Sequence, residues 1–354
     1  MSKKPGISFD DLAVRHSEHV QELQSQLKDM EGVLSGYRKE HGKLESFFGN
    51  LKLAIKPVVP LPSLSVPKSE KVSSPCVAVM QISDGHMGSV QMADEIEGFG
   101  EFSPEICEAR QVDFVNRFVE WIFMHRQSYT INEVAVLVTG DLISGDIHQE
   151  LSVTNAFPVP VQCVRAAEVL TKQIGLVAPH FEKITVHFIV EDNHARLTRK
   201  PQAKEAGYNS LNYVVGKIAE IYLSKHDNVE FNLYPQYEKV VRVSTLQYLI
   251  SHGHGLVGWM GIPWYSITRH VGKEATARMQ VIMGDITRAK DVGFHKYVFG
   301  HWHTPYNHPL YSCSGSVQGT DAFDHKMGRH ADPSQSAWII HPSHGEFNRI
   351  NFTL

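Results

Sequence analysis

Apolar residues recur at alternating steps of four and three from Phe9 to Leu51, and charged residues and glutamines fill many of the positions between them. No proline interrupts this stretch, and Ser8, with Asp11 three positions later, is typical of a helix N-cap. The spacing holds for about six heptads, which predicts one long helix that forms the seam of a coiled coil. An amphipathic helix packed on its own globular domain is the alternative interpretation.

The composition changes after this stripe. Residues 57–75 contain five prolines and five serines. Such a composition predicts an extended, semi-rigid tether rather than a folded element. We therefore divide the chain into an N-terminal coiled-coil helix at 1–56, a Pro/Ser-rich linker at 57–75 and a single globular domain at 76–354.

From Cys76 onward, short apolar runs alternate with longer amphipathic segments. The runs have the length of strands and are apolar on both faces; they lie at residues 76–83, 134–139, 184–190, 246–251 and 296–299. Helical patterns lie near residues 106–126, 161–177 and 210–223, whereas residues 311–354 contain short strand-like pieces and predict no helix. This alternation predicts an α/β domain whose sheet is buried on both faces.

Composition excludes several classes of protein. Of the 354 residues, 42% are hydrophobic and 10% aromatic, which is enough to form a packed core rather than a disordered chain. With 34 basic and 38 acidic residues, the formal net charge of −4 excludes a protein that coats nucleic acid over its whole surface, although a local basic patch remains compatible. The 4 cysteines are far apart and form no CxxC pair, which disfavours a disulfide framework and a thiolate zinc site.

The sequence predicts neither a secretion signal nor a membrane span. The amino terminus lacks the apolar core of a signal peptide, and no window reaches about 18 uninterrupted apolar residues. We therefore expect a soluble, cytoplasmic protein without a membrane partner.

Polar residues come directly after each of the five strand-like runs. These residues are Asp84 and His86, Asp141, Asn193 and His194, His252 and His254, and His301 and His303. Functional sites in open α/β sheets form beyond the carboxyl ends of the strands. Carboxylate, imidazole and amide groups suit divalent metals, and one shared carboxylate can bridge two ions about 3.5–4 Å apart. A histidine at one strand end is usually a packed residue, but five such strand ends in order predict a metal site.

The order of these motifs, D-x-H, G-D, N-H, H and G-H-x-H, resembles that of the calcineurin-like metallophosphoesterases over residues 77–305. The resemblance implies a four-layer α/β/β/α sandwich with a dinuclear metal site at one edge. It implies seven ligands: Asp84, His86 and His303 for one ion, Asn193, His252 and His301 for the other, and Asp141 as the bridge. It also assigns His194 to the scissile phosphate and to the departure of the leaving group.

Two departures from the family's patterns narrow the resemblance. Asp192 precedes the Asn-His pair, where the family usually has glycine; its carboxylate would repel a phosphate, orient His194 or simply fit the local turn. After Asp141 the chain lacks the Asp and Arg of the G-D-x-x-D-R-G motif of the protein serine/threonine phosphatases, and Ser144 stands where purple acid phosphatases have a tyrosine ligand. The sequence is therefore nearest to the phosphodiesterase and nuclease members, which include the double-strand-break repair nucleases and their smaller phage-encoded relatives.

Basic residues near the motifs are candidates for contacts with a substrate. Arg196 lies two positions after His194 and begins the basic stretch 196–204, and a second basic stretch spans residues 269–290. Such side chains hold a nucleic-acid backbone through its phosphates, although a solvated helix face is the alternative for the second stretch. Arg196 and His254 are the candidate substrate-binding residues, with a scaffold role as the alternative for His254.

These observations predict a dinuclear-metal-dependent phosphoesterase, and within that class a phosphodiesterase or nuclease that acts on nucleic acid, with DNA as one candidate, or on nucleotides. Two divalent ions, with Mn²⁺ as first choice and Zn²⁺, Fe²⁺ or Ni²⁺ as alternatives, would supply a metal-bound hydroxide that attacks phosphorus. The alternative is a non-catalytic scaffold or binding subunit of the same fold. The chain retains all seven expected ligands, which favours the enzyme. In either case we expect a homo-oligomer that assembles through the N-terminal coiled coil.

Overall fold

The chain divides into two units, Met1–Ile55 and Lys56–Leu354. The computed structural model describes residues 9–54, 75–147, 150–258 and 263–354. The first unit contains α1 (Phe9–Ala54), a single helix of 46 residues where a long helix was predicted. Several side chains of its apolar stripe are exposed in the single chain: Val20, Leu23, Leu27 and Met30. The coiled coil stays a prediction, and residues 57–74 of the predicted linker lie outside the described residues.

The second unit is built on two β-sheets. The larger sheet has the strand order β11-β10-β1-β2-β3-β4; β1 to β4 are parallel, and β10 and β11 are antiparallel to their neighbours. Its strands are β1 (Pro75–Ile82), β2 (Thr130–Val138), β3 (Lys183–Ile189), β4 (Val229–Tyr234), β10 (Ser334–His341) and β11 (Gly345–Thr353). The smaller sheet has the order β5-β6-β7-β9-β8, with β6, β7 and β9 parallel. Its strands are β5 (Glu238–Val243), β6 (Leu246–Ser251), β7 (Lys296–Phe299), β8 (Tyr306–His308) and β9 (Tyr311–Cys313).

A hydrophobic core joins the inner faces of the two sheets. Apolar side chains from both sheets contribute to it, among them Val79, Leu137, Tyr248, Val298 and Trp338. Because the central strands are apolar on both faces, the outer face of each sheet must also be covered.

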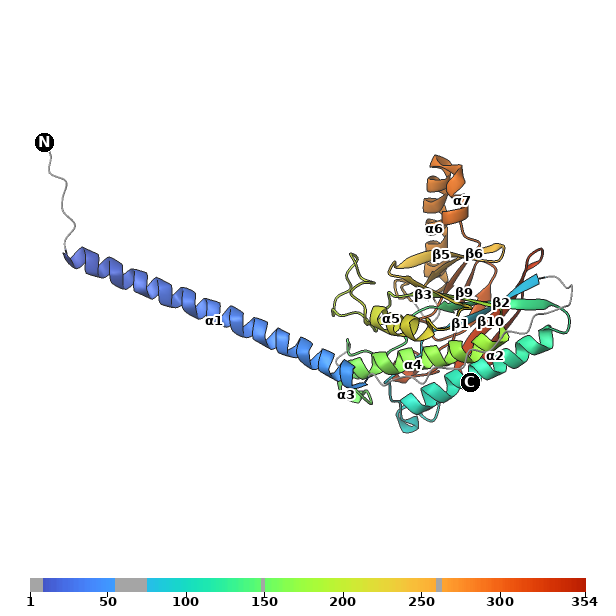
Figure 1. Ribbon diagram of the computed structural model, residues 1–354, viewed down its shortest axis with the longest axis horizontal. Coiled ribbons are helices and arrows are strands. Elements are labelled where there is room, and N and C mark those ends of the chain that lie inside the picture. Colours follow the sequence, from blue (N-terminus) through green and yellow to red (C-terminus); the bar gives the residue numbers. More distant parts are fainter. Residues whose placement is uncertain (1–8, 55–74, 148–149, 259–262) are drawn as a thin grey trace. The chain divides into compact units, whose positions relative to one another are not determined.

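Helices cover these outer faces and complete four layers (Figure 1). The longer helices are α2 (Pro104–His125), α4 (Val159–Val177), α5 (Leu211–Leu223) and α6 (Trp264–Gly284). The first three pack in sequence on the larger sheet, where the ring of Phe114 in α2 contacts that of Phe352 in β11. On the other side, Ile267 of α6 packs into the cluster that contains Tyr297 of β7. The predicted α/β/β/α order is confirmed.

Short helical segments connect the main elements. They are α3 (Leu151–Thr154), α7 (Ala289–Val292), α8 (Ala322–Lys326) and three 3₁₀ turns at Ala93–Ile96, Ala178–His180 and Ile286–Arg288. Among the described helices, none is long and apolar enough to cross a membrane.

The five predicted strands correspond to β1, β2, β3, β6 and β7, and the three predicted helices correspond to α2, α4 and α5. Strands β4 and β5 were not predicted, because side chains such as Asn232 and Arg242 interrupt their apolar pattern. The prediction of no helix in residues 311–354 was wrong, since α8 lies there. With only five residues, α8 is too short to show helical periodicity. Its start is fixed by Asp321, whose side chain caps the helix by accepting from the backbone N–H of Asp324.

Candidate metal centre

The carboxyl ends of β1, β2, β3, β6 and β7 meet at one edge of the two sheets. Hydrogen bonds join the sheets at this edge: the amide of Gln81 donates to the carbonyl oxygen of Phe299 across 2.9 Å. The backbone N–H of His301 donates to both carboxylate oxygens of Asp84, at 3.0 and 3.1 Å. Two predicted ligands that are 217 positions apart in the sequence are therefore in direct contact.

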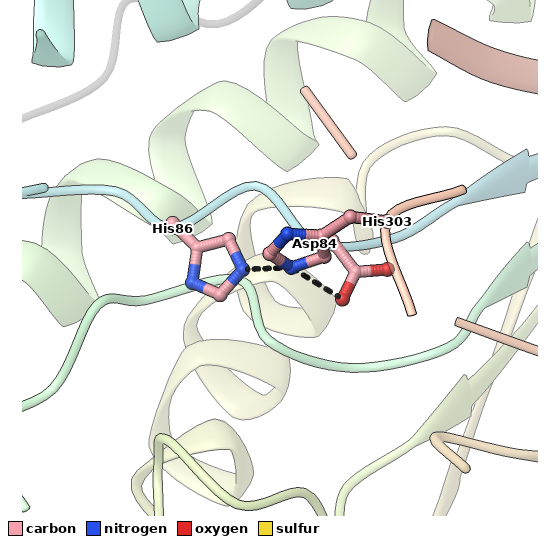
Figure 2. Close-up of side chains that lie close together, drawn as sticks. All are labelled: Asp84, His86 and His303. Carbon is pink, nitrogen blue, oxygen red and sulfur yellow. Dashed lines mark hydrogen bonds and ion pairs between the residues drawn. The ribbon is translucent and has the colours of Figure 1, made fainter. Parts of the chain in front are cut away.

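Asp84, His86 and His303 form a first group of potential ligands, which is drawn in Figure 2. One ligand atom from each lies within 4.8 Å of the others. Nε2 of His303 lies 3.7 Å from Oδ1 of Asp84 and 3.1 Å from Nε2 of His86. Within this group the three side chains direct an oxygen and two ring nitrogens at one small volume.

Asp141, His252 and His301 form a second group with the same spread of ligand atoms. Nε2 of His252 lies 2.9 Å from Oδ2 of Asp141 and 3.0 Å from Oδ1 of Asn193. Asp141 also belongs to a group with His86 and His194, so its carboxylate lies between the two sets of ligands. The structure thus brings all seven predicted ligands together, while their binding of metal stays a prediction.

The backbone at these strand ends is unusual. Five of the seven predicted ligands have a positive φ, namely Asp84 (51°), His86 (43°), Asp141 (49°), His301 (70°) and His303 (55°). Non-glycine residues adopt this left-handed region at an energetic cost, and such residues concentrate at functional sites. The strained turns are therefore evidence for a functional role, and this evidence is independent of the motif pattern.

Glycine is required at two positions next to predicted ligands. A Cβ atom at Gly140, whose φ is +96°, would lie 2.8 Å from Nδ1 of His252. A Cβ atom at Gly300 would lie 2.5 Å from Oδ2 of Asp84. Both distances are too short for non-bonded contact, so the glycines of the G-D and G-H-x-H motifs allow the two sheets to approach each other.

Carbonyl oxygens of the backbone fix two imidazole rings of the site. Nδ1 of His252 lies 2.7 Å from the carbonyl oxygen of Thr139, and Nδ1 of His194 lies 2.7 Å from that of Ser144. Because a carbonyl oxygen can only accept, Nδ1 carries the proton in both rings. In the neutral ring Nε2 then keeps the lone pair that a metal ligand or a proton acceptor needs.

The buried charges of the site require cations. The Asp141 side chain is 1% exposed; burial raises its pKa, but His252 and His194 together lower the pKa to well below its usual range. Burial lowers the pKa of His252, but Asp141 raises it more, to about 10. Protonated His252 thus balances the buried charge of Asp141, a role that divalent ions can take over.

The donor set fits a pair of divalent ions. It consists of carboxylate oxygens, imidazole nitrogens and one amide oxygen, which suit ions from Mn²⁺ to Zn²⁺ without any thiolate. Burial, followed by the neighbouring histidines, holds the pKa of His86 and of His301 well below the usual range. Both rings are therefore neutral near pH 7 and have a nitrogen lone pair available for a metal ion. The residues present therefore fit the predicted dinuclear centre.

His194 lies beside the two groups of ligands. Its Nε2 is 3.9 Å from Oδ2 of Asp141, and its ring meets that of His86 edge-on with centroids 4.8 Å apart. The side chain is 18% exposed, whereas Asp141 is almost completely buried. His194 is therefore one of the partly exposed members of this cluster, where a phosphate could approach from solvent.

Asp192 is bound to the protein itself. Its side chain is 3% exposed, and its carboxylate accepts from the backbone N–H groups of Asp141 (2.7 Å) and Ala195 (2.8 Å) and from the side-chain amide of Asn212. Burial and the charge of Asp141 raise the pKa of Asp192 to about 8. Of the three roles considered for Asp192, fitting the local turn agrees with these contacts.

The two candidate substrate-binding residues lie near the site in different ways. The guanidinium of Arg196 donates to the carbonyl oxygens of Thr198 (3.1 Å) and Arg199 (3.3 Å), so it is held against its own loop. The ring of His254 lies 5.7 Å from that of His252, and burial lowers its pKa to about 4. His254 thus packs beside His252 of the second group, which agrees with the scaffold alternative.

The second basic stretch lies largely on α6. Arg278 there forms an ion pair with Glu274 one turn earlier, at 3.2 Å, and donates to the carbonyl oxygen of Val292. Arg278 is therefore held against the protein, whereas Arg269 and Lys273 on the same helix are exposed.

Sequence reasoning missed Asp324 and Arg329. Oδ2 of Asp324 lies 2.6 Å from Nδ1 of His303, and Arg329 pairs with the other carboxylate oxygen at 2.5 Å. Burial lowers the pKa of His303, but Asp324 raises it more, to about 9. Neither residue follows a strand-like run, so no pattern in the sequence marked them.

Comparison with known proteins gives distant similarities. No protein-family model matches the sequence, and the comparison with curated proteins gave no match. Vps29 from Entamoeba histolytica, solved in complex with Zn²⁺, is 11% identical, and the alignment covers 78% of this chain and 98% of that one with a TM-score of 0.31. A predicted phosphoesterase from Streptococcus pneumoniae is 9% identical (79% and 98% covered, TM-score 0.26), and a putative 5′-nucleotidase from Staphylococcus aureus is 8% identical (78% and 54% covered, TM-score 0.32). Because the sequence identities and TM-scores are this low, the functional conclusion rests on the residues of the site.

Proposed function

We propose that this chain is a dinuclear-metal-dependent phosphoesterase. The observation that carries the proposal is the place of Asp141, whose carboxylate belongs to one group with His86 and His194 and to another with His252 and His301. A carboxylate shared between two groups can hold two divalent ions close enough to act on one phosphoryl group. When bound, such ions supply Lewis acidity and a water nucleophile with a pKa lowered toward neutrality.

In this proposal His194 exchanges a proton with the leaving group. Its Nδ1 proton is held by the carbonyl oxygen of Ser144, so Nε2 is the nitrogen at which a proton is gained or lost. The backbone N–H of His194 also donates to Oδ1 of Asp141, at 3.3 Å, which ties the position of the ring to the proposed bridging carboxylate. Protonated at Nε2, His194 donates to the departing oxygen as a general acid.

We propose a phosphodiester as the substrate, either in nucleic acid, with DNA the first polymer to test, or in a nucleotide. The motif departures near Asp141 argue against the protein serine/threonine phosphatase and purple acid phosphatase branches of the resembled family. Three basic side chains that follow His194 are exposed: Arg199, Lys200 and Lys204. Exposed basic groups attract the negatively charged phosphates of a nucleic-acid backbone.

We further propose that α1 gathers several chains into a homo-oligomer. The stripe of α1 exposes apolar side chains, including Leu23, Leu27 and Met30, which a second helix of the same kind would cover. Several linked catalytic domains would raise the avidity for a polymeric substrate without any new contact.

A metal-resolved activity screen tests the proposed function. Metal-free full-length protein is loaded separately with Mn²⁺, Zn²⁺, Fe²⁺ or Ni²⁺ and assayed on a generic phosphomonoester, a generic phosphodiester, single-stranded and duplex DNA, RNA and cyclic nucleotides. We expect hydrolysis of the diester and of at least one nucleic acid or nucleotide, lost in Asp141→Asn and retained in the exposed control Asp227→Asn.

The screen also tests the alternative of a non-catalytic scaffold. A chain that binds two ions yet hydrolyses none of these substrates would contradict the enzyme and favour the scaffold. Hydrolysis of the monoester alone would keep the metallophosphoesterase and contradict the phosphodiester.

A further inference from the structure

A carboxylate outside the predicted ligand set lies directly behind His303. Oδ2 of Asp324, in α8, lies 2.6 Å from Nδ1 of His303. On the opposite side of the ring, Nε2 faces Oδ1 of Asp84 at 3.7 Å and Nε2 of His86 at 3.1 Å. Asp324 is 3% exposed, so water competes poorly for this contact. His303 therefore connects α8 to the first group of ligands.

Asp324 is itself held in place from several sides. Its Oδ1 pairs with the guanidinium of Arg329 at 2.5 Å, and its backbone N–H donates to Oδ1 of Asp321 at 2.7 Å. The backbone N–H of Arg329 donates back to the carbonyl oxygen of Asp324 at 2.8 Å. The guanidinium also lies over the ring of Trp302, which is the residue between His301 and His303. Arg329, Asp324 and His303 thus form one chain of charged contacts that ends at the metal centre.

We propose that Asp324 is a positioning residue that holds His303 with Nδ1 protonated and Nε2 directed at the first group, and that Arg329 fixes Asp324 for this purpose. This inference rests on the proposed metal centre. A carboxylate that accepts from the distal nitrogen of a metal-binding histidine sets the orientation of the ring and increases its basicity as a ligand.

The two halves of the centre differ in this respect. The ring of His252, in the second group, is held by the neutral carbonyl oxygen of Thr139, whereas that of His303 is held by an ionised carboxylate. The affinity of the first group for its ion therefore depends on the short helix α8, and the affinity of the second group does not.

A third cation bound by Asp324 is the competing interpretation. His303, Asp321 and Asp324 also place ligand atoms within 4.8 Å of one another. However, the guanidinium of Arg329 already occupies one oxygen of Asp324, and Asp321 is engaged as the cap of α8. These contacts favour a supporting role for Asp324 over a further metal site.

Calorimetric titration of metal-free full-length protein with Mn²⁺ tests the proposal. We expect two sites in the unmodified chain, and Asp324→Ala should weaken one of them by about 10–100-fold and leave the other nearly unchanged. Asp324→Asn keeps an acceptor oxygen but loses the charge. Its affinity for the ion of the weakened site should lie between those of the unmodified chain and of Asp324→Ala. Asp332→Ala, an exposed aspartate in the same segment, is the matched control and should bind as the unmodified chain does.

A second measurement reads the position of the ring without metal. In metal-free protein labelled with ¹⁵N-histidine, the buried Nδ1 proton of His303 should give a slowly exchanging signal, assigned by its loss in His303→Gln. That signal should disappear in Asp324→Ala and persist in Asp332→Ala. If Asp324→Ala does not fold, both measurements are made on Asp324→Asn, where the signal should shift and the weaker site should be detectable.

The outcomes separate this inference from the proposed function. Two unweakened sites in the folded Asp324 variant, or a third ion lost with Asp324, would overturn the positioning role and leave the enzyme standing. Two ions bound with one weakened in Asp324→Ala, but no hydrolysis of any phosphoester, would overturn the enzyme and leave the positioning role standing. A chain that binds no divalent ion would overturn both.

Discussion

His252 donates its Nδ1 proton to the carbonyl oxygen of Thr139 across 2.7 Å. The two residues are 113 positions apart, and each directly follows a strand of a different sheet. The bond leaves Nε2 of His252 2.9 Å from Oδ2 of Asp141. The contact that joins the two sheets thus also orients a predicted ligand, so correct packing of the core and correct geometry of the site depend on each other.

Asp141→Asn should cost the protein both ions, because the substitution removes the charge of the carboxylate that the two groups share. The measurement is elemental analysis after loading with Mn²⁺ and removal of the excess. Asp227→Asn, an exposed aspartate, should keep the metal content of the unmodified chain. Two ions per chain in Asp141→Asn would contradict the shared bridge.

His194→Ala should keep its metal and lose rate. The ring lies beside the ligand groups and is not needed to hold the ions, whereas the loss of a general acid typically lowers the rate about 10²–10⁴-fold. Metal content and turnover of a diester with a poor leaving group are measured on the same sample. Full turnover on that diester would show that another group protonates the leaving oxygen; His226→Ala, a histidine remote from the strand-end motifs, serves as the control.

Asp192→Ala should lower the free energy of unfolding. The substitution leaves the buried backbone N–H groups of Asp141 and Ala195 and the amide of Asn212 without this acceptor. Each unsatisfied buried donor costs about 1–3 kcal/mol. Urea unfolding of the metal-free protein measures the change, with Asp227→Ala as the exposed control. An unfolding midpoint equal to that of the control would argue that Asp192 has no structural role in these loops.

Leu27→Asp should dissociate the proposed oligomer, because it places a charge in the apolar stripe of α1. Gln26→Asp places the same charge one position away, outside the stripe, and should leave the oligomer intact. Light scattering at micromolar concentration measures both. A monomeric unmodified chain would exclude the coiled coil and favour the helix that packs on its own domain.

Glu346→Gln should destabilise the fold by about 3–5 kcal/mol at neutral pH, because it removes the carboxylate charge that two buried cations share. Glu346 accepts from Lys296 at 2.7 Å and from Arg349 at 3.5 Å. Burial raises the pKa of Glu346, but these cations lower it to below its usual range. The stabilisation is therefore complete above the unfolded pKa of about 4.3 and is lost as the pH falls through the folded value.

Urea unfolding at several pH values measures this effect. The difference between Glu346→Gln and the unmodified chain should shrink as the pH is lowered below about 4. Glu120→Gln, an exposed glutamate, should show a small difference at every pH. A difference of the same size at acidic and neutral pH would show that the carboxylate charge of Glu346 is not what stabilises the fold.

The local sequence determined the central strands and the residues that follow them. An apolar run of strand length and the polar residue after it are adjacent in the chain, so Asp84, Asp141 and His252 could be assigned to strand ends before any contact was known. The parallel arrangement of such strands then predicted that their carboxyl ends meet. Long helices such as α2 and α4 were predicted for the same reason, because their periodicity repeats over many residues.

Only the tertiary structure decided which groups support the site. The carboxylate of Asp324 reaches His303 from a five-residue helix, Asp192 is satisfied by backbone N–H groups of two loops, and Arg196 turns toward its own loop. No local pattern encodes these relationships, because each depends on where a distant or irregular segment packs. The physical reason is that secondary structure follows from neighbours along the chain, whereas the orientation and charge of a buried side chain follow from neighbours in space.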